Sequence, residues 1–308
     1  MTTDTGHPLP TRYDPRQAAM LAVFGMSCLA FIDNFVPVIA RDIGLWQFHA
    51  ARSAMILAGL LPLAVLMGWR LRPRSWRAVA WRSFCIASAM MLYFGATATM
   101  PVSQVAAGLL SSPIFVVLIS WGFYGAEIGK WRWLAVTLGF AGVLLVLRPS
   151  GDTLSVLNVV PLFAGLLYAL GAVATRRYCA DENEAVLVAG FFGTSGLFGV
   201  VGLLVLAGTV TDPAIDGFFG TGLQTWTSDA LFWTFWQAVV SVIGIGSLFR
   251  AYLLAEASHV AVFEYAFIVA AAFWGYMLWG QVPDAFALLG MAFIIAAGVV
   301  IIKRSGAA

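Results

Sequence analysis

Two carboxylates lie well inside long apolar stretches of this sequence, and they are the residues best placed to do chemistry. Glu264 comes about two helical turns into one stretch, and Asp33 lies within another. A charge at the centre of a lipid-spanning helix costs about 3 kcal/mol or more, so an acid there is a functional-site candidate by default. A low dielectric favours the neutral carboxyl, which suits a residue that binds an amine or carries a proton. The alternative is a buried carboxylate satisfied by arginine, tyrosine or backbone groups.

Arginines inside the apolar stretches could bind the acidic group of a solute. Arg52 lies about two turns into the second stretch, with His49 one turn earlier on the same helical face. Arg52 keeps its charge at ordinary pH, so it must either pair with Asp33 or clamp a carboxylate or phosphate through its bidentate fork. His49 could gate Arg52 by titrating near neutral pH, or it could be a plain hydrogen-bonded histidine. Arg82 and Arg250 lie nearer the ends of their stretches, where snorkelling toward the surface explains them, although Arg250 could also face the solute path.

Uncharged polar residues inside the same stretches predict the lining of a cavity. Lipid offers no hydrogen-bond partner, so these side chains are expected to face inward, toward each other or toward water. Tyrosines deep within a stretch are expected there too, whereas aromatic residues near the ends fit the interfacial belt. The residues expected to line the cavity, besides the charged ones, are Asn34, Gln104, Asn158, Gln237, Ser241, Tyr93, Tyr168 and Tyr265.

The composition of the chain excludes a soluble protein. Of its 308 residues, 61% are hydrophobic and only 10% are charged, whereas a soluble domain carries about 25% charged residues. Apolar runs of about 20 residues recur throughout and predict an all-α integral membrane protein. The sequence contains no G-x-S-x-G, H-E-x-x-H or Walker motif, so we expect neither an enzyme nor direct use of ATP. We also expect no cofactor, no bound metal and no nucleic acid partner.

Hydropathy and charge together predict the topology. Twelve of the seventeen basic residues fall on one side of the membrane when the N-terminus is cytosolic, as the positive-inside rule requires. Residues 1–16 are polar and are expected to form a disordered cytosolic tail. Both termini of this multi-pass protein are therefore expected in the cytosol, and the bilayer is expected to be the cell inner membrane. The ten expected spans are roughly residues 17–40, 46–67, 77–98, 101–123, 131–147, 155–175, 184–208, 230–254, 257–280 and 284–302.

Glycine recurs every third residue in the seventh expected span. Three residues advance a helix by about 300°, so the row drifts by about 60° per step around the helix. The row predicts close packing of neighbouring helices along a spiral path rather than along one face. Its members are Gly190, Gly193, Gly196, Gly199 and Gly202.

An internal repeat predicts two halves of opposite orientation. Ser103-Gln-Val-Ala106 aligns with Ser258-His-Val-Ala261, and Gly125 then aligns with Gly280. Each copy belongs to the last two helices of a five-helix half. Because five is odd, the second half enters the membrane from the opposite side, which is the arrangement of inverted-repeat transporters. The two repeats are expected at residues 17–148 and 154–304.

The sequence resembles the EamA family of the drug/metabolite transporter superfamily over nearly the whole chain after residue 17. The resemblance implies ten helices in two inverted repeats, and export or import of small polar metabolites. It is carried by Phe48-His-Ala-Ala-Arg52, Ser112-Pro113-Ile-Phe115, Gly125-Ala-Glu127, Phe140-Ala-Gly-Val143, Phe263-Glu-Tyr265, Leu289-Gly290 and Ala297-Gly298.

We therefore expect a secondary transporter that moves a small polar metabolite by alternating access. Glu264, Asp33, Arg52 and the deep tyrosines would line a site between the halves. Three intramembrane arginines against two acids favour a zwitterionic or anionic solute, such as an amino acid or a carboxylate. A proton as a second ligand, the direction of transport and the oligomeric state stay open. A membrane channel or sensor is the alternative, and an intramembrane enzyme is a weaker one.

Overall fold

The computed structural model describes residues 14–69, 71–96, 108–147, 159–280, 282 and 284–305, and these residues form helices joined by short connections. Most of the helices carry apolar residues on all their faces, as helices in a lipid environment do. The helices are α1 (Pro15–Asp33), α2 (Val36–Ile39), α3 (Leu45–Leu66), α4 (Trp76–Ala96), α6 (Ser112–Gly122), α7 (Lys130–Leu147), α8 (Val159–Tyr178), α9 (Glu184–Val205), α10 (Pro213–Gly220), α11 (Ser228–Leu254), α12 (Ala257–Glu264), α13 (Ala266–Trp279) and α14 (Ala285–Ser305).

Six helical segments of the described chain are long and apolar enough to cross a membrane. Several helices begin at side chains that cap the free backbone N–H groups. Asp14 accepts from the backbone N–H of Gln17 at the start of α1, and Thr227 accepts from that of Ala230 at the start of α11. The six long apolar segments make the chain a multi-pass membrane protein. The six segments are Pro15–Ile39, Leu45–Leu66, Trp76–Ala96, Glu184–Val205, Ser228–Leu254 and His259–Leu278.

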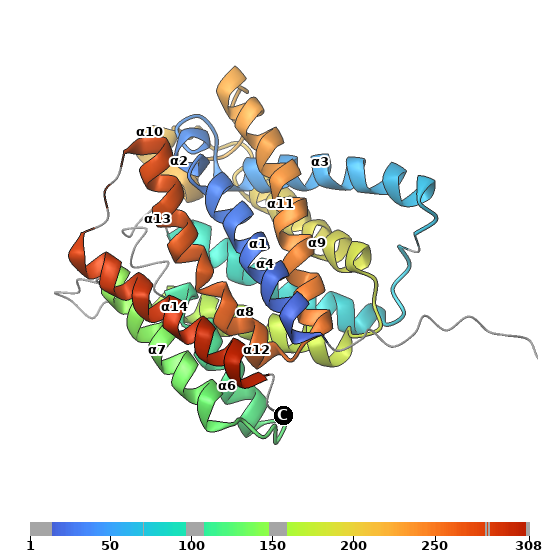
Figure 1. Cartoon of the computed structure of the whole chain (residues 1–308). Coiled ribbons are helices and arrows are strands. Elements are labelled where there is room, and N and C mark those ends of the chain that lie inside the picture. Colours follow the sequence, from blue (N-terminus) through green and yellow to red (C-terminus); the bar gives the residue numbers. More distant parts are fainter. Residues whose placement is uncertain are drawn as a thin grey trace, which may run out of the picture.

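Four helix pairs make the most extensive contacts in the bundle: α7 with α14, α1 with α11, α4 with α8, and α3 with α9. Figure 1 shows α7 and α14 running side by side at one edge, while α2 and α10 lie together at one end of the bundle. Glycines allow the close approach in these pairs, because a Cβ at Gly25 of α1 would lie 2.5 Å from the carbonyl oxygen of Gly244 in α11.

The glycine row of α9 packs along a spiral, as predicted. A Cβ at Gly190 would meet Ser83 and Val79 of α4, whereas one at Gly199 would lie 2.7 Å from the carbonyl oxygen of Trp46 in α3. At Gly193, between these two faces, a Cβ would meet nothing within 4 Å among the described atoms. The row therefore turns from one neighbouring helix to the other.

Three interruptions of the helices lie where polar or cavity-lining residues occur. The first span breaks between Asp33 and Val36, and the chain before α6 makes a turn at Leu110 and Ser111. The ninth span breaks at Tyr265, with φ −58° and ψ −19°, between α12 and α13. Each turn carries i→i+3 backbone hydrogen bonds of the 3₁₀ type, for example from Ile268 N to the Tyr265 carbonyl.

Two glycines end their helices in the same unusual conformation. Gly125, after α6, has φ +62°, and Gly280, after α13, has φ +65°. A left-handed residue at a helix end satisfies the last carbonyls and is most readily adopted by glycine. The aligned pair of the sequence repeat thus shares a local structure, while the segment around Ser103 lies outside the described residues.

Candidate functional site

A cavity of about 120 Å³ lies at the centre of the bundle and has room for several water molecules. Residues of α1, α3, α4, α6, α8, α9, α11, α12 and α13 line it, together with the turn before α6. Most of its lining is apolar, from residues such as Met90 and Leu248. Its charged and phenolic side chains are five of the predicted site residues, namely Asp33, Arg52, Tyr93, Tyr168 and Glu264.

Glu264 is held by two phenols rather than by an arginine. Tyr168 of α8 donates to Glu264 Oε1 over 3.2 Å, and Tyr252 of α11 donates to the same oxygen. The carboxyl is 3% exposed and belongs to the cavity wall. Both bonds engage Oε1, and no ion pair between described residues includes Glu264. A cationic group of a ligand would therefore meet an acid that no described side chain neutralises.

Asp33 and Arg52 are linked through Gln237, a fully buried residue of α11. Gln237 Nε2 donates to Asp33 Oδ1 over 3.0 Å, and Arg52 Nη1 donates to Gln237 Oε1 over 3.2 Å. Ser241 also donates to Gln237 Oε1, over 2.9 Å. The amide therefore has one fixed orientation, with its oxygen toward the arginine and its nitrogen toward the acid. The pairing of Arg52 with Asp33 that the sequence allowed is thus indirect.

Aromatic rings fill the rest of the surroundings of Arg52. Its Cζ lies 5.1 Å from the ring centroid of Phe48 and 5.3 Å from that of Phe192. Such faces stabilise a guanidinium that water reaches poorly. The guanidinium is thus held by Gln237 and by aromatic faces, and Arg52 also belongs to the lining of the cavity.

His49 and Tyr265 lie behind the cavity wall rather than in it. His49 is fully buried between the rings of Phe48 and Phe94, and neither ring nitrogen has a hydrogen-bond partner among the described residues. Tyr265 is fully buried as well, and its ring fills the space beside Gly139 of α7. Neither side chain joins the lining that the sequence predicted for them.

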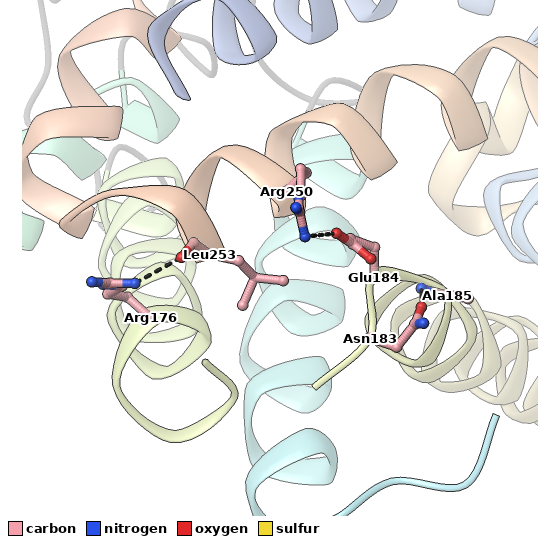
Figure 2. A network of polar contacts seen from close by, with 6 residues as sticks. All are labelled: Arg176, Asn183, Glu184, Ala185, Arg250 and Leu253. Atoms are coloured by element: carbon pink, nitrogen blue, oxygen red, sulfur yellow. Dashed lines mark hydrogen bonds and ion pairs between the residues drawn. The ribbon is translucent and has the colours of Figure 1, made fainter. Parts of the chain in front are cut away.

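Two further predicted site residues are engaged elsewhere. Asn34 donates to the carbonyl of Ala30 over 2.7 Å and so completes the end of α1. Arg250 forms an ion pair with Glu184 at the start of α9, outside the cavity, and its side chain is 39% exposed (Figure 2). Gln104 and Asn158 lie outside the described residues.

The C-terminal end of α11 is tied to α8 and α9 by polar contacts (Figure 2). Arg176 of α8 donates to the carbonyl of Leu253 over 2.7 Å. Asn183 accepts from the backbone N–H of Ala185 and caps α9 beside the Arg250–Glu184 pair. Arg250 therefore belongs to a helix-end network and not to the cavity.

Sequence reasoning was wrong about Arg82 and missed Tyr252. Arg82 does not snorkel to the surface, because its side chain is completely buried between α4, α8, α9 and α11. Tyr252 lies three residues from the end of α11, where an interfacial position is the ordinary expectation. The tight connection between α11 and α12 brings its phenol back to Glu264, and spacing alone gives no signal for that contact.

A second cavity, of about 510 Å³, lies between α2 and α10. Pro37 and Arg41 line one side and Pro213 and Phe218 the other. Asp33, Tyr93 and Phe94 line both cavities. These three side chains therefore separate the central cavity from the end of the bundle where α2 and α10 lie.

The chain is similar to a known family and to named members of it. A family model described as the EamA-like transporter family matches residues 16–148. The pseudopaline exporter CntI of Pseudomonas aeruginosa is 31% identical over 212 residues, which cover 68% of each chain. The riboflavin transporter of Rhizobium johnstonii is 25% identical over 207 residues, which cover 67% of this chain and 64% of that protein. The chain thus spans about two thirds of the length of both relatives.

One solved structure has a similar fold over nearly the whole chain. It is described only as "Crystal structure of protein", and it superposes with a TM-score of 0.72. The match covers 94% of this chain and 96% of that one at 14% sequence identity. At this identity the match concerns the fold alone.

Proposed function

This chain belongs to the EamA-like transporter family, and we propose that it carries a small polar solute across the cell inner membrane by alternating access. It is a membrane transporter and not an enzyme, in agreement with the names of its relatives. The solute site we propose is the central cavity, with Glu264 at one end and the Arg52–Gln237–Asp33 link at another. Alternating access requires two halves that can exchange conformations around a fixed site.

We propose ten spans in two inverted halves, residues 17–148 and 154–304. The helix pairs fit this arrangement, because exchanging spans one to five with spans six to ten turns the α1–α11 pair into the α8–α4 pair. The same exchange turns the α3–α9 pair into itself, and likewise the α7–α14 pair. The family model ends at residue 148, where the first proposed half ends.

The strongest support comes from the register of the cavity lining. Ile86, Met90, Tyr93 and Phe94 of α4 line the cavity, and so do the residues 155 positions later in α11, which are Ser241, Ile245, Leu248 and Phe249. The turn before α6 and the ninth span follow the same offset, with Leu109 and Ser112 opposite Glu264 and Phe267. A constant offset around one cavity is what a twofold axis through that cavity would produce.

Two of the five left-handed glycines in the described residues, and two of the helix breaks, share that offset. Gly125 and Gly280 are 155 positions apart, and so are Leu110 and Tyr265, where the helices are interrupted. Interrupted helices near the membrane midplane are typical of transporter binding sites, because their free backbone groups can meet a ligand.

The positive-inside rule supports a cytosolic location for both termini. The end of the bundle that holds Arg176 and Arg177 would then face the cytosol, and α2 and α10 would face outward. The second cavity would be the outer entrance to the central one.

The charges of the cavity narrow the solute class. Arg52 is the arginine in the described lining, against the two acids Asp33 and Glu264. Arg82 and Arg250 lie outside the cavity, so its lining has fewer positive charges than the sequence predicted. This favours a solute that carries an amine over a purely anionic one. We propose a solute that bears both a cationic amine and an acidic group, as an amino acid does. The amine would bind Glu264, and the acidic group would bind Arg52.

A thermal-shift screen of the purified protein tests this assignment. The panel contains amino acids, their decarboxylated amines, their deaminated acids, and riboflavin, the compound that one relative is named for. We expect the zwitterions to raise the melting temperature and both truncated series to lose most of the shift. Glu264→Gln should abolish the shift, and Glu184→Gln, at a half-buried ion pair outside the cavity, should retain it. A shift by the acids or by riboflavin alone would contradict the proposed solute class.

A further inference from the structure

A second buried arginine lies on the inner side of the central cavity. Arg82 Nε donates to Thr175 Oγ1 of α8 over 3.1 Å, and Nη1 donates to the Leu187 carbonyl of α9 over 2.7 Å. Nη2 has no hydrogen-bond partner among the described residues, although the side chain is 0% exposed. None of the ion pairs between described residues includes Arg82. The guanidinium is thus buried inside the helix bundle, and no carboxylate of the described residues forms an ion pair with it.

Phe249 separates this arginine from the cavity. The Phe249 ring lines the cavity, and its centroid lies 3.7 Å from Arg82 Cζ. Ile86, one helical turn after Arg82, lines the cavity as well. One aromatic ring therefore stands between the solute space and the unpaired guanidinium, and rotation of that ring would bring the two into contact.

A purely structural role fits these contacts poorly. Burying an unpaired charge is expensive, and a neutral side chain could join Thr175 and the Leu187 carbonyl at a lower cost. A guanidinium nitrogen left without an acceptor suggests that its acceptor arrives from elsewhere.

The position of Arg82 in the proposed twofold gives it a counterpart. Gln237 lies 155 positions later and is also 0% exposed. Gln237 bonds to Asp33 of α1 and Arg52 of α3, the first and second spans. Arg82 bonds to α8 and α9, the sixth and seventh spans. Each half thus contributes the central residue of one buried polar cluster, and the partners of that residue come from the first two spans of the other half.

The aromatic rings follow the same relation. Phe94 and Phe249 are 155 positions apart, and both line the cavity. Phe94 also lines the outer cavity, whereas Phe249 covers Arg82. The two rings occupy equivalent places on the outer and inner sides of the solute space.

We propose that Arg82 is a second binding residue for the acidic group of the solute, a carboxylate or phosphate, and that Phe249 is the gate that uncovers it when the protein opens inward. This role rests on the proposed function, since it assumes that the central cavity is the solute path. The acidic group would meet Arg52 on the outer side and Arg82 on the inner side. Arg52 and Arg82 would thus serve the two ends of one path.

The test measures local charge with thiol reagents and needs no transported solute. Cys28, Cys85 and Cys179 are replaced by alanine, and Ile245→Cys places a reporter in the cavity wall one turn before Phe249. Modification rates are measured from each face of the membrane with the anionic sulfonatoethyl methanethiosulfonate and the cationic trimethylammonioethyl methanethiosulfonate. The ratio of the anionic to the cationic rate reports the potential at the reporter.

We expect Arg82→Gln to lower this ratio roughly tenfold or more from the cytosolic face, because one positive charge is lost at short range. Arg250→Gln, at the half-buried ion pair outside the cavity, should leave it unchanged. Phe249→Leu should raise the anionic rate relative to the cationic one, because a smaller side chain would then cover Arg82. This variant tests the proposal if Arg82→Gln does not fold. An unchanged ratio in these variants, or a reporter that reacts from neither face, would overturn the role of Arg82. If the protein with its native Arg82 and Phe249 transported no zwitterion while the charge effect was present, the result would instead count against the proposed function.

Discussion

The phenol of Tyr252, near the end of α11, donates a hydrogen bond to Glu264, at the end of α12. The two residues are twelve positions apart and belong to different helices. The connection between the helices folds the chain back so that the phenol meets the acid. Tyr168 donates to the same carboxyl oxygen from α8. Neutral donors therefore hold Glu264, and no cationic side chain of the described residues pairs with it.

Glu264→Gln should reduce transport efficiency, kcat/KM, by roughly 100-fold, which corresponds to about 2.7 kcal/mol. The amide has nearly the same shape as the carboxyl but cannot neutralise an amine. The rate of solute uptake into proteoliposomes gives the effect, with Glu184→Gln as the matched control at a half-buried acid outside the cavity. Normal uptake by the Glu264 variant would remove this residue from the binding site.

Arg52→Lys should weaken solute binding although it keeps the charge. Lysine cannot present the planar fork that meets a carboxylate with two parallel hydrogen bonds, and it would lose the contact from Nη1 to Gln237. We expect a rise of roughly tenfold or more in KM with a smaller change in kcat. A KM equal to that of the unmodified protein would contradict bidentate binding of the solute by Arg52.

Gln237→Leu should destabilise the protein by about 3 kcal/mol, because it removes the bridge between a buried acid and a buried arginine. The melting temperature in detergent measures this loss. Phe235→Leu, at a half-exposed position on the same helix, is the control and should cause little change. Equal melting temperatures for the two variants would mean that Asp33 and Arg52 do not depend on the amide.

Gly199→Ala should lower the melting temperature, whereas Gly193→Ala should leave it unchanged or raise it slightly. Both glycines lie in α9 and belong to the same three-residue row. A Cβ at Gly199 would come within 2.6 Å of the Ala50 backbone nitrogen in α3, but one at Gly193 meets only open space among the described atoms. Alanine also has the better helix propensity, by about 1 kcal/mol. Equal effects of the two changes would contradict the packing of α3 on α9.

The helical character of the chain, its apolar spans and six members of the cavity wall could be predicted from the sequence. Long apolar runs and misplaced charges carry that information, because lipid penalises both unpaired backbone and isolated ions. Glu264 and Asp33 stand out for this reason before any contact is known. The glycine row of α9 could be interpreted because its spacing alone determines where the glycines face.

The orientation of side chains next to the site could not be predicted equally well. Successive helix residues point about 100° apart, so Tyr265 packs on α7 although its neighbour Glu264 faces the cavity. The break at Tyr265 occurs without a proline in that span. The position of Arg250 outside the cavity could not be predicted from its polarity, because it depends on an ion pair with Glu184 at the start of α9.

Depth along a helix was also misleading for Arg82. It lies six residues after the start of α4, where snorkelling is the ordinary expectation. Packing of α8, α9 and α11 around that end of α4 closes the way to the surface. Such burial depends on tertiary contacts between distant segments.

Solute counterflow tests alternating access most directly. Proteoliposomes are loaded with a high concentration of the unlabelled compound that gives the largest thermal shift, and are diluted into a trace of the same compound with a radioactive label. We predict a transient accumulation of label above its equilibrium level, because a carrier that returns loaded exchanges inner for outer solute. The accumulation should be absent in liposomes without protein and strongly reduced with Glu264→Gln. Entry that only equilibrates, with no overshoot, would contradict a carrier and indicate a channel.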